Sequence, residues 1–145
     1  MNNRIKIKRV DKSLPLPEYK TKGAVAFDIY SRIAAKIKPQ EVKLLPTNLI
    51  IKVPKGYFLM VASRSGTFKK GIMMANNVGI LDQDYNGPED ELNFAAYNFS
   101  AKPVKIEIGE RIAQGLIIPV KKVLWQETEK ISRKSRGGFG STGKK

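Results

Sequence analysis

The chain has 145 residues, of which 41% are hydrophobic and 28% are charged, a composition typical of a single domain with a real hydrophobic core. It contains no Cys and no His, which excludes disulfides, zinc ligation by these residues, and Cys or His nucleophiles. Any catalysis must therefore use carboxylates, hydroxyls, Lys, Arg, backbone dipoles or a hard metal bound by carboxylate or phosphate.

The formal net charge is +14, from 27 Lys and Arg against 13 Asp and Glu. Such a charge favours polyanionic partners such as nucleotides or nucleic acid, although a solvated basic surface accounts for it equally well. No apolar run approaches the roughly 18 residues that span a bilayer, and the opening "MNNRIKIKRV" lacks the apolar segment of a signal peptide. We therefore expect a cytoplasmic protein with no membrane partner.

The predicted regular elements are short strands. Apolar residues alternate with polar or small ones, or form short runs, and turn signals such as "LPLPEY", "VPKG" and "AKP" separate these segments. The predicted strands lie at 4–8, 48–53, 57–62, 92–97 and 104–108. Residues 66–77 leave room for one short helix. The pattern predicts an all-β sandwich or barrel of many short strands.

The last residues differ in composition from the rest. Residues 130–145, "KISRKSRGGFGSTGKK", contain little that could pack into a core, so they are expected to be mobile when no ligand is bound. We therefore divide the chain into a β domain at 1–130 and a flexible C-terminal arm at 131–145.

Three internal blocks could carry chemistry. "SRSG" (63–66) ends a strand with a guanidinium, a hydroxyl and an open amide, which suits a phosphate. "NNVGILDQDYNG" (76–87) resembles a hairpin with a carboxylate and a ring near its tip, where open backbone groups could pair with a nucleobase. "GERIAQGLIIPV" (109–120) places Gln114 among predicted core residues. A simpler explanation remains open for each block. The first could be a plain strand end, the second an ordinary turn, and Gln114 of the third an amide at an edge or interface.

The arm contains "GGFGSTG" (137–143). Phe139 could stack on a base, Ser141 and Thr142 could bind a terminal phosphate, and nearby cations could neutralise it. The glycines would let the backbone fold tightly around a ligand. A disordered tail without a role is the simpler alternative.

Five ordered blocks together resemble the trimeric deoxyuridine triphosphate nucleotidohydrolases, the dUTPases. They are "GAVAFDIYS", "SRSG" leading to "KKGI", "NNVGILDQDYNG", "GERIAQ" and "RGGFGSTG", and the match runs from about Pro17 to Gly143. The resemblance implies a jelly-roll-like dUTPase fold (β-clip), a homotrimer with three interface active sites, and Mg²⁺-assisted hydrolysis of dUTP to dUMP and pyrophosphate. Such an activity lowers dUTP and supplies dUMP for thymidylate synthesis.

The resemblance also implies residue roles. Asp82 corresponds to the carboxylate that activates a water for attack on the α-phosphorus, and Tyr85 to the ring that leaves no room for a 2′-hydroxyl. The backbone of four residues would form the uracil slot: Asn76, Gly79, Ile80 and Leu81. Steric exclusion and an unmatched hydrogen bond would reject other bases.

The remaining roles concern the phosphates. The resemblance assigns phosphate binding to Arg64, Ser65, Gly66 and Gln114, base covering to Phe139, and γ-phosphate binding to Ser141 and Thr142. Asp28 would support the site rather than react. Mg²⁺ would be bound by the triphosphate and water, with no direct protein ligand.

Several positions depart from the family pattern. Ala26 and Ser63 replace the usual Gly and Pro, and Lys134 stands where an arginine usually binds the γ-phosphate. Arg136 or Arg133 could supply that cation. "PEDE" (88–91) is inserted after "DYNG" and is either a solvated bulge or an added acidic feature near the site.

Two alternative functions remain open at this point. A dCTP deaminase shares the fold and would need groups that protonate and hydrate cytosine. A basic nucleic-acid or regulatory binding module without activity would explain the charge, and nonspecific nucleic-acid binding could also accompany catalysis.

Overall fold

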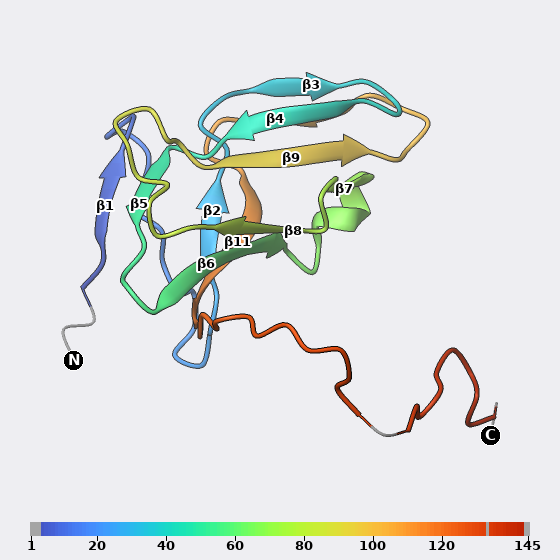
Figure 1. The fold of residues 1–145 in the computed structure, drawn as a ribbon. Coiled ribbons are helices and arrows are strands. Elements are labelled where there is room, and N and C mark those ends of the chain that lie inside the picture. Colours follow the sequence, from blue (N-terminus) through green and yellow to red (C-terminus); the bar gives the residue numbers. More distant parts are fainter. Residues whose placement is uncertain (1–3, 133, 144–145) are drawn as a thin grey trace.

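The computed structural model describes residues 4–132 and 134–143. Apart from one 3-10 turn, the regular elements of these residues are short β-strands, which confirms the all-β prediction with at most one short helix (Figure 1). The elements are β1 (Lys6–Arg9), β2 (Phe27–Tyr30), β3 (Ala35–Ile37), β4 (Val42–Pro46), β5 (Leu49–Lys52), β6 (Tyr57–Ser63), η1 (Thr67–Lys70), β7 (Ile72–Met74), β8 (Val78–Leu81), β9 (Asn93–Asn98), β10 (Val104–Ile106) and β11 (Arg111–Pro119).

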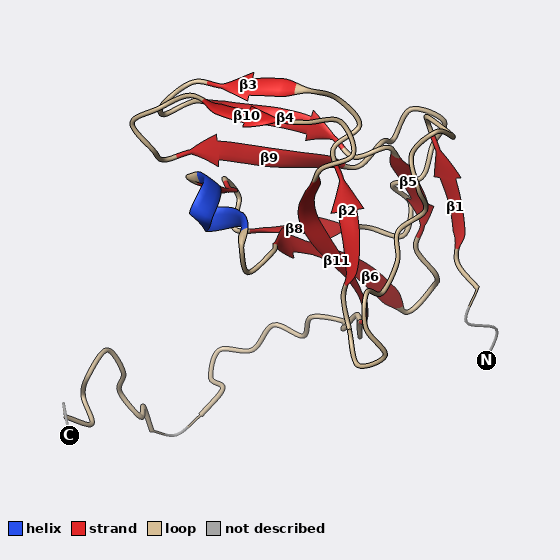
Figure 2. Cartoon of the chain, turned by 180° about the vertical axis from the view of Figure 1, so that it is seen from behind, coloured by secondary structure: helices blue, strands red, loops and turns tan. Residues whose placement is uncertain are grey.

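The strands form two main layers and a flanking pair. One layer is the four-stranded antiparallel sheet β2-β11-β6-β8, and the other combines β4-β9-β7 with the pair β10-β3. Figure 2 shows β3, β10, β4 and β9 stacked in the second layer, while β1 and β5 pair at the side. This arrangement is the sandwich-like alternative of the sequence prediction.

The core fills the space between the layers. Leu59 and Val61 of β6 and Phe94 of β9 are fully buried and belong to one contiguous apolar cluster. In β9, exposed or half-buried residues alternate with buried ones, as the pattern at 92–97 predicts. Each fully buried side chain of this kind contributes about 1.5 to 3 kcal/mol of hydrophobic stabilisation.

The predicted hairpin at 76–87 is wrong in its pairing. β8 pairs with β6 in one layer, whereas the following strand β9 pairs with β4 and β7 in the other. Residues 82–92 therefore cross between the layers instead of closing a hydrogen-bonded hairpin. The carboxylate and the ring still lie in the turn that follows β8, because those positions depend on the end of the strand and not on its partner.

The chain beyond Pro119 leaves the body of the fold. Residues 120–132 and 134–143 contain no strand or helix, and their side chains are exposed. Figure 1 shows this tail extending away from both layers. The division of the chain at residue 130 stays a prediction. Within the described residues, no helix has the length and apolar character required to span a bilayer.

Candidate active site

The turn after β6 is fastened to β11. Thr67 is buried, and its hydroxyl accepts a hydrogen bond from the Arg64 amide at 3.1 Å while its own amide donates to the Arg64 carbonyl at 3.0 Å. The Thr67 hydroxyl also contacts the Ile112 carbonyl at 3.4 Å. This reciprocal turn fixes the direction in which the Arg64 side chain leaves the end of β6.

Asp28 of β2 holds two guanidinium groups. Its Oδ1 lies 2.9 Å from Arg64 Nε and its Oδ2 lies 3.1 Å from Arg111 Nη1. The Asp28 residue is only 8% exposed, so one buried carboxylate orders two arginines and leaves a net positive charge. Such a group suits an anionic ligand. Asp28 thus holds Arg64 in place, and its role in supporting an active site stays a prediction.

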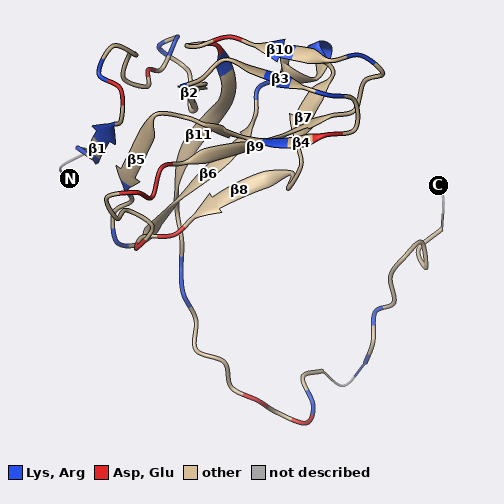
Figure 3. Cartoon of the chain, turned by 90° about the horizontal axis from the view of Figure 1, so that it is seen from above, with Lys and Arg blue, Asp and Glu red and all other residues tan. Residues whose placement is uncertain are grey.

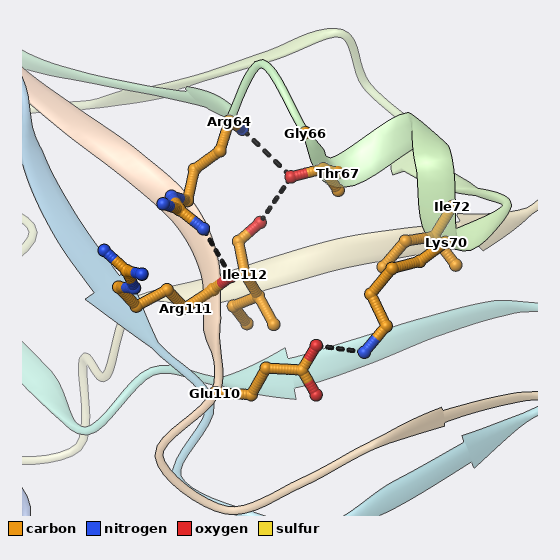
Figure 4. Close-up of a pocket in the computed structure, with 8 residues that line it drawn as sticks. All are labelled: Arg64, Gly66, Thr67, Lys70, Ile72, Glu110, Arg111 and Ile112. Carbon is orange, nitrogen blue, oxygen red and sulfur yellow. Dashed lines mark hydrogen bonds and ion pairs between the residues drawn. The ribbon is translucent and has the colours of Figure 1, made fainter.

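These arginines border a pocket of about 260 Å³, shown in Figure 4. Its lining consists of Arg64, Gly66, Thr67, Lys70, Ile72, Glu110, Arg111 and Ile112. Lys70 forms an ion pair with Glu110, whose other oxygen accepts the Glu107 amide at 2.9 Å. Three cations against two carboxylates, Glu110 and the Asp28 that pairs with both arginines, leave an excess of positive charge, which makes this pocket a candidate phosphate site. We call it the arginine pocket.

Sequence reasoning missed Arg111 and Lys70 in this pocket. Arg111 lies in the block "GERIAQ", where only Gln114 was singled out. Gln114 is half-buried, and its Nε2 donates to the Ser63 carbonyl at 3.1 Å. It therefore lies against the end of β6, next to the predicted phosphate-binding turn. The signal for Arg111 was its place three residues before Gln114, but its contact with Asp28 depends on strand pairing that no local pattern reveals.

A second pocket, of about 250 Å³, gathers the predicted nucleoside residues. It is lined by Met74, Asn76, Gly79, Ile80, Leu81, Asp82, Tyr85, Leu92 and Asn93. Asp82 follows the end of β8 and is exposed, and the Tyr85 amide contacts the Asp82 carbonyl at 3.4 Å. All six residues predicted for uracil, sugar and water thus border one cavity, which we call the β8 pocket.

Gly79 keeps the β8 pocket open. A Cβ at this position would lie 3.1 Å from Met74 Cε and 3.4 Å from Val61 Cβ. The contact with Met74 is tighter than ordinary van der Waals packing, whereas the contact with Val61 is at the lower limit of the ordinary range. A larger residue at position 79 would therefore require Met74, which also lines the pocket, to shift.

Asp82 and Arg64 lie at opposite ends of β6. Leu81 pairs with Leu59 near the start of β6, whereas Arg64 directly follows its last residue. At about 3.3 Å per residue, Asp82 and Arg64 are on the order of 20 Å apart along the strand. The ion pair with Asp28 also turns Arg64 toward β2, the strand furthest from β8 in the sheet. One chain does not bring Arg64 beside Asp82.

The structure brings the arm to neither pocket. Phe139, Ser141 and Thr142 are exposed in the tail, as is Arg136. Two tight turns shape this segment, since the Ser141 amide donates to the Gly138 carbonyl and the Gly143 amide to the Gly140 carbonyl, each at 3.0 Å. Ser65 is exposed at the turn after β6. Arg133, an alternative phosphate ligand, lies outside the described residues.

Within the described part of the chain, no three His, Cys, Asp or Glu residues form a group that could hold a metal ion. In the arginine pocket the Glu110 carboxylate is paired with Lys70, and the Asp28 carboxylate beside it is engaged by two guanidinium groups. A metal ion at this site would therefore depend mainly on oxygen ligands from a bound triphosphate and from water.

Comparisons with known proteins show the family to which the chain belongs. The dUTPase family model matches residues 12–143. The deoxyuridine 5′-triphosphate nucleotidohydrolase of Dictyoglomus turgidum is 41% identical, with 97% of this chain and 98% of the relative covered. The enzyme of the same name from Nautilia profundicola is 40% identical over 97% of this chain and 99% of its own.

Solved structures show the same fold. The Staphylococcus bacteriophage 80alpha dUTPase with dUpNHpp superposes with a TM-score of 0.86 at 26% identity, covering 97% of this chain and 99% of that one. The dUTPase from Streptococcus mutans gives a TM-score of 0.75 at 25% identity, covering 82% and 98%. The chain therefore belongs to the dUTPase family of enzymes, the deoxyuridine 5′-triphosphate nucleotidohydrolases.

Proposed function

We propose that this protein hydrolyses dUTP to dUMP and pyrophosphate, with Asp82 as the base that activates the attacking water. The observation that carries the proposal is the β8 pocket, where an exposed carboxylate, a tyrosine ring and the open backbone of β8 border one cavity. An aspartate is ionised at neutral pH and can accept a proton from water.

The reaction follows from the positions of these groups. The backbone at Asn76, Gly79, Ile80 and Leu81 pairs with the edge of uracil, and the Tyr85 ring packs on the deoxyribose. Asp82 then takes a proton from a water that attacks the α-phosphorus. The bond from this phosphorus to the bridging oxygen breaks, and pyrophosphate leaves with the bonding electrons.

The phosphates need cations, and the arginine pocket offers them. Members of this family are generally metal-dependent, and we propose Mg²⁺, which would offset charge on the triphosphate. Arg64 orients the phosphate oxygens, the open amides at Ser65 and Gly66 donate to them, and Gln114 contributes its amide. Asp28 keeps Arg64 and Arg111 in place.

The separation of Asp82 from Arg64 supports a homotrimer with sites between subunits. Since Arg64 and Asp82 of one chain lie on the order of 20 Å apart along β6, the phosphates at one Asp82 need the arginine pocket of another copy. The outer face of the sheet β11-β6-β8 is also apolar. Val78 and Ile80 are 41% and 64% exposed, and Ile80 pairs with Met60, which pairs with Leu116. An apolar face of this kind favours coverage by another subunit.

The arm completes the proposal. Phe139 would cover the uracil, Ser141 and Thr142 would bind the γ-phosphate, and Arg136 would supply a cation, with Lys134 and Arg133 as alternatives. The tail from residue 120 extends away from its own body (Figure 1). We propose that it reaches a neighbouring subunit. In this proposal the arm begins at residue 131. The protein acts in the cytoplasm.

The test is hydrolysis by the purified protein with Mg²⁺ and dUTP, dTTP, dCTP or UTP. We expect pyrophosphate from dUTP and much less from the others. Asp82→Asn should lower kcat by a factor on the order of 10² to 10⁴, the usual contribution of a general base. Asp84→Asn is the matched control, since Asp84 lies in the same turn but does not border the pocket. Ammonia release from dCTP instead would indicate a deaminase.

Nonspecific nucleic-acid binding stays a prediction. Figure 3 shows Lys and Arg on both layers and along the tail, with acidic segments between them. A salt-sensitive affinity for DNA that persists in Asp82→Asn would reveal such binding, because contacts with phosphates weaken steeply as salt rises.

A further inference from the structure

The inserted segment "PEDE" is anchored by its last residue. Arg32 Nε and Nη2 donate to Glu91 Oε1 and Oε2 at 2.8 and 2.9 Å. The Glu91 side chain is only 14% exposed and the Arg32 side chain 30%. Burial of this kind, with two parallel hydrogen bonds, makes the pair stronger and geometrically more specific than a surface ion pair. Glu91 also raises the pKa of Arg32, through their hydrogen bond.

A third segment shares the same carboxylate. The Asn48 amide donates to Glu91 Oε1 at 2.7 Å. Asn48 is buried in a left-handed conformation, with φ of 74°, and its side chain makes hydrogen bonds of 2.6 and 2.9 Å with the backbone of Asp11. Glu91 therefore connects the crossing segment to the turn between β4 and β5 and, through Asn48, to the N-terminal segment.

The backbone at Glu91 in turn holds Tyr85. The Tyr85 hydroxyl donates to the Glu91 carbonyl at 3.3 Å. The next residue, Leu92, is buried, and its amide donates to the Leu49 carbonyl at 2.9 Å. Its carbonyl accepts both the amide and the hydroxyl of Thr47. Tyr85, itself 40% exposed, is thus tied to a point of the backbone that the core and the ion pair both fix.

We infer that Arg32 and Glu91 are positioning residues that set the Tyr85 ring against the sugar and so determine how strongly the enzyme rejects ribonucleotides. The inference rests on the proposed function and on the role proposed there for Tyr85. Residues 82–91 belong to none of the strand pairs of the described structure, so their placement depends on anchors such as this one. Exclusion of a single hydroxyl requires a ring held to within a fraction of an ångström.

The four residues of "PEDE" have different surroundings. Pro88 and Glu89 are exposed, as in a solvated bulge. The Asp90 carboxylate accepts the Gly87 amide at 2.6 Å, which closes the turn. Glu91 points inward to Arg32. The insertion is therefore neither a wholly solvated bulge nor an acidic group facing the substrate. Its last residue, Glu91, supports the β8 pocket through the hydrogen bond between its carbonyl and Tyr85.

The experiment compares kcat/KM for dUTP and UTP in variants of the full-length protein. Glu91→Gln and Arg32→Gln remove the ion pair. Arg32→Lys keeps the positive charge but cannot form the bidentate hydrogen bonds to the carboxylate. Glu41→Gln is the matched control: Glu41 also accepts a backbone amide, from Lys38, and pairs with Lys43 on the β3–β4 turn. All assays are run well below each variant's unfolding temperature.

We expect Glu91→Gln and Arg32→Gln to reduce the ratio of the two kcat/KM values about tenfold, the factor that corresponds to 1.4 kcal/mol. Arg32→Lys should give an intermediate ratio, and Glu41→Gln should leave it unchanged. A purely structural role would lower the unfolding temperature and both kcat/KM values together without changing their ratio, and that result would overturn the inference.

The role of Tyr85 is checked in parallel. If Tyr85→Ala loses the preference for dUTP while Glu91→Gln and Arg32→Gln keep it, the inference is wrong and the proposed function stands. If the wild-type protein does not hydrolyse dUTP at all, both fail. Faster amide hydrogen exchange at residues 83–90 in Glu91→Gln, but not in Glu41→Gln, would support the positioning role without reference to activity.

Discussion

The Asp28 carboxylate lies 2.9 Å from Arg64 Nε across the sheet, and so fixes the arginine proposed to bind the phosphates. Asp28→Asn should release both Arg64 and Arg111. Because hydrogen bonds to charged groups contribute about 1.5 to 3 kcal/mol, kcat/KM for dUTP should fall about ten- to a hundredfold. Steady-state kinetics with Mg²⁺ measures this effect.

Glu18→Gln is the control for Asp28→Asn. Among the described residues, the Glu18 side chain forms its ion pair with exposed Lys20, so Glu18→Gln removes one carboxylate outside both pockets. The Glu18 carbonyl, which accepts the Asp28 amide at 3.2 Å, is unchanged in this variant. Unchanged kinetics in Asp28→Asn would show that Arg64 reaches the phosphates without its ion pair.

Asp11 gives a prediction about pH. The Ser13 hydroxyl and backbone amide hold the pKa of Asp11 below its usual value of 3.8. A carboxylate whose pKa is lower in the folded state stabilises the fold above its unfolded pKa, and this stabilisation is lost as pH falls through the folded pKa. Asn imitates the protonated carboxyl. The unfolding temperature of Asp11→Asn should therefore lie below that of the wild type at pH 6, and the difference should shrink as the pH falls below 3.8.

Thermal unfolding followed by circular dichroism at several pH values measures this difference. The Asp11 side chain is exposed, so the effect should be small and should weaken with added salt. A difference between the two proteins that stays constant from pH 6 to pH 3 would contradict the assignment.

Gly115 allows β11 to pass the Phe27 ring. A Cβ at Gly115 would lie 2.6 Å from Phe27 Cζ and 3.1 Å from Leu59 Cδ1. Gly115→Ala should therefore lower the free energy of unfolding by about 1 to 3 kcal/mol, the usual cost of overpacking a core. Chemical denaturation measures it. Gly23→Ala is the control, because nothing lies within 4 Å of a Cβ at that position, and equal stabilities of the two variants would contradict the prediction.

Local features of the fold and the site could be predicted from the sequence. The alternation at 92–97 predicts the buried and exposed positions of β9, and the apolar run before "SRSG" predicts that Arg64 follows a strand. Asp82 and Tyr85 border one pocket because they lie in a single turn after β8. Each of these features depends on residues only a few positions apart.

Contacts between distant segments could not be predicted. Arg111 reaches Asp28 because β2 and β11 pair, with 83 positions between the two residues. Arg32 and Glu91 are separated by 59 positions. The wrong hairpin has the same cause, since the local pattern at 76–87 indicates a turn between apolar stretches but not that the strand before the turn pairs with β6. Strand pairing depends on how the whole core packs, which one local pattern does not specify.

The separation of Asp82 and Arg64 along β6 predicts complementation between inactive subunits. Asp82→Asn lacks the base and Arg64→Ala lacks the phosphate cation, so each homotrimer should be inactive. If one site takes Asp82 and Arg64 from different chains, a randomly mixed trimer contains sites in which both residues are intact. Equal mixing after reversible unfolding should then restore about one quarter of the wild-type activity per subunit. Mixing without subunit exchange is the control and should restore none. If each chain used its own Asp82 and Arg64, no mixture would recover activity, and the intersubunit site would be refuted.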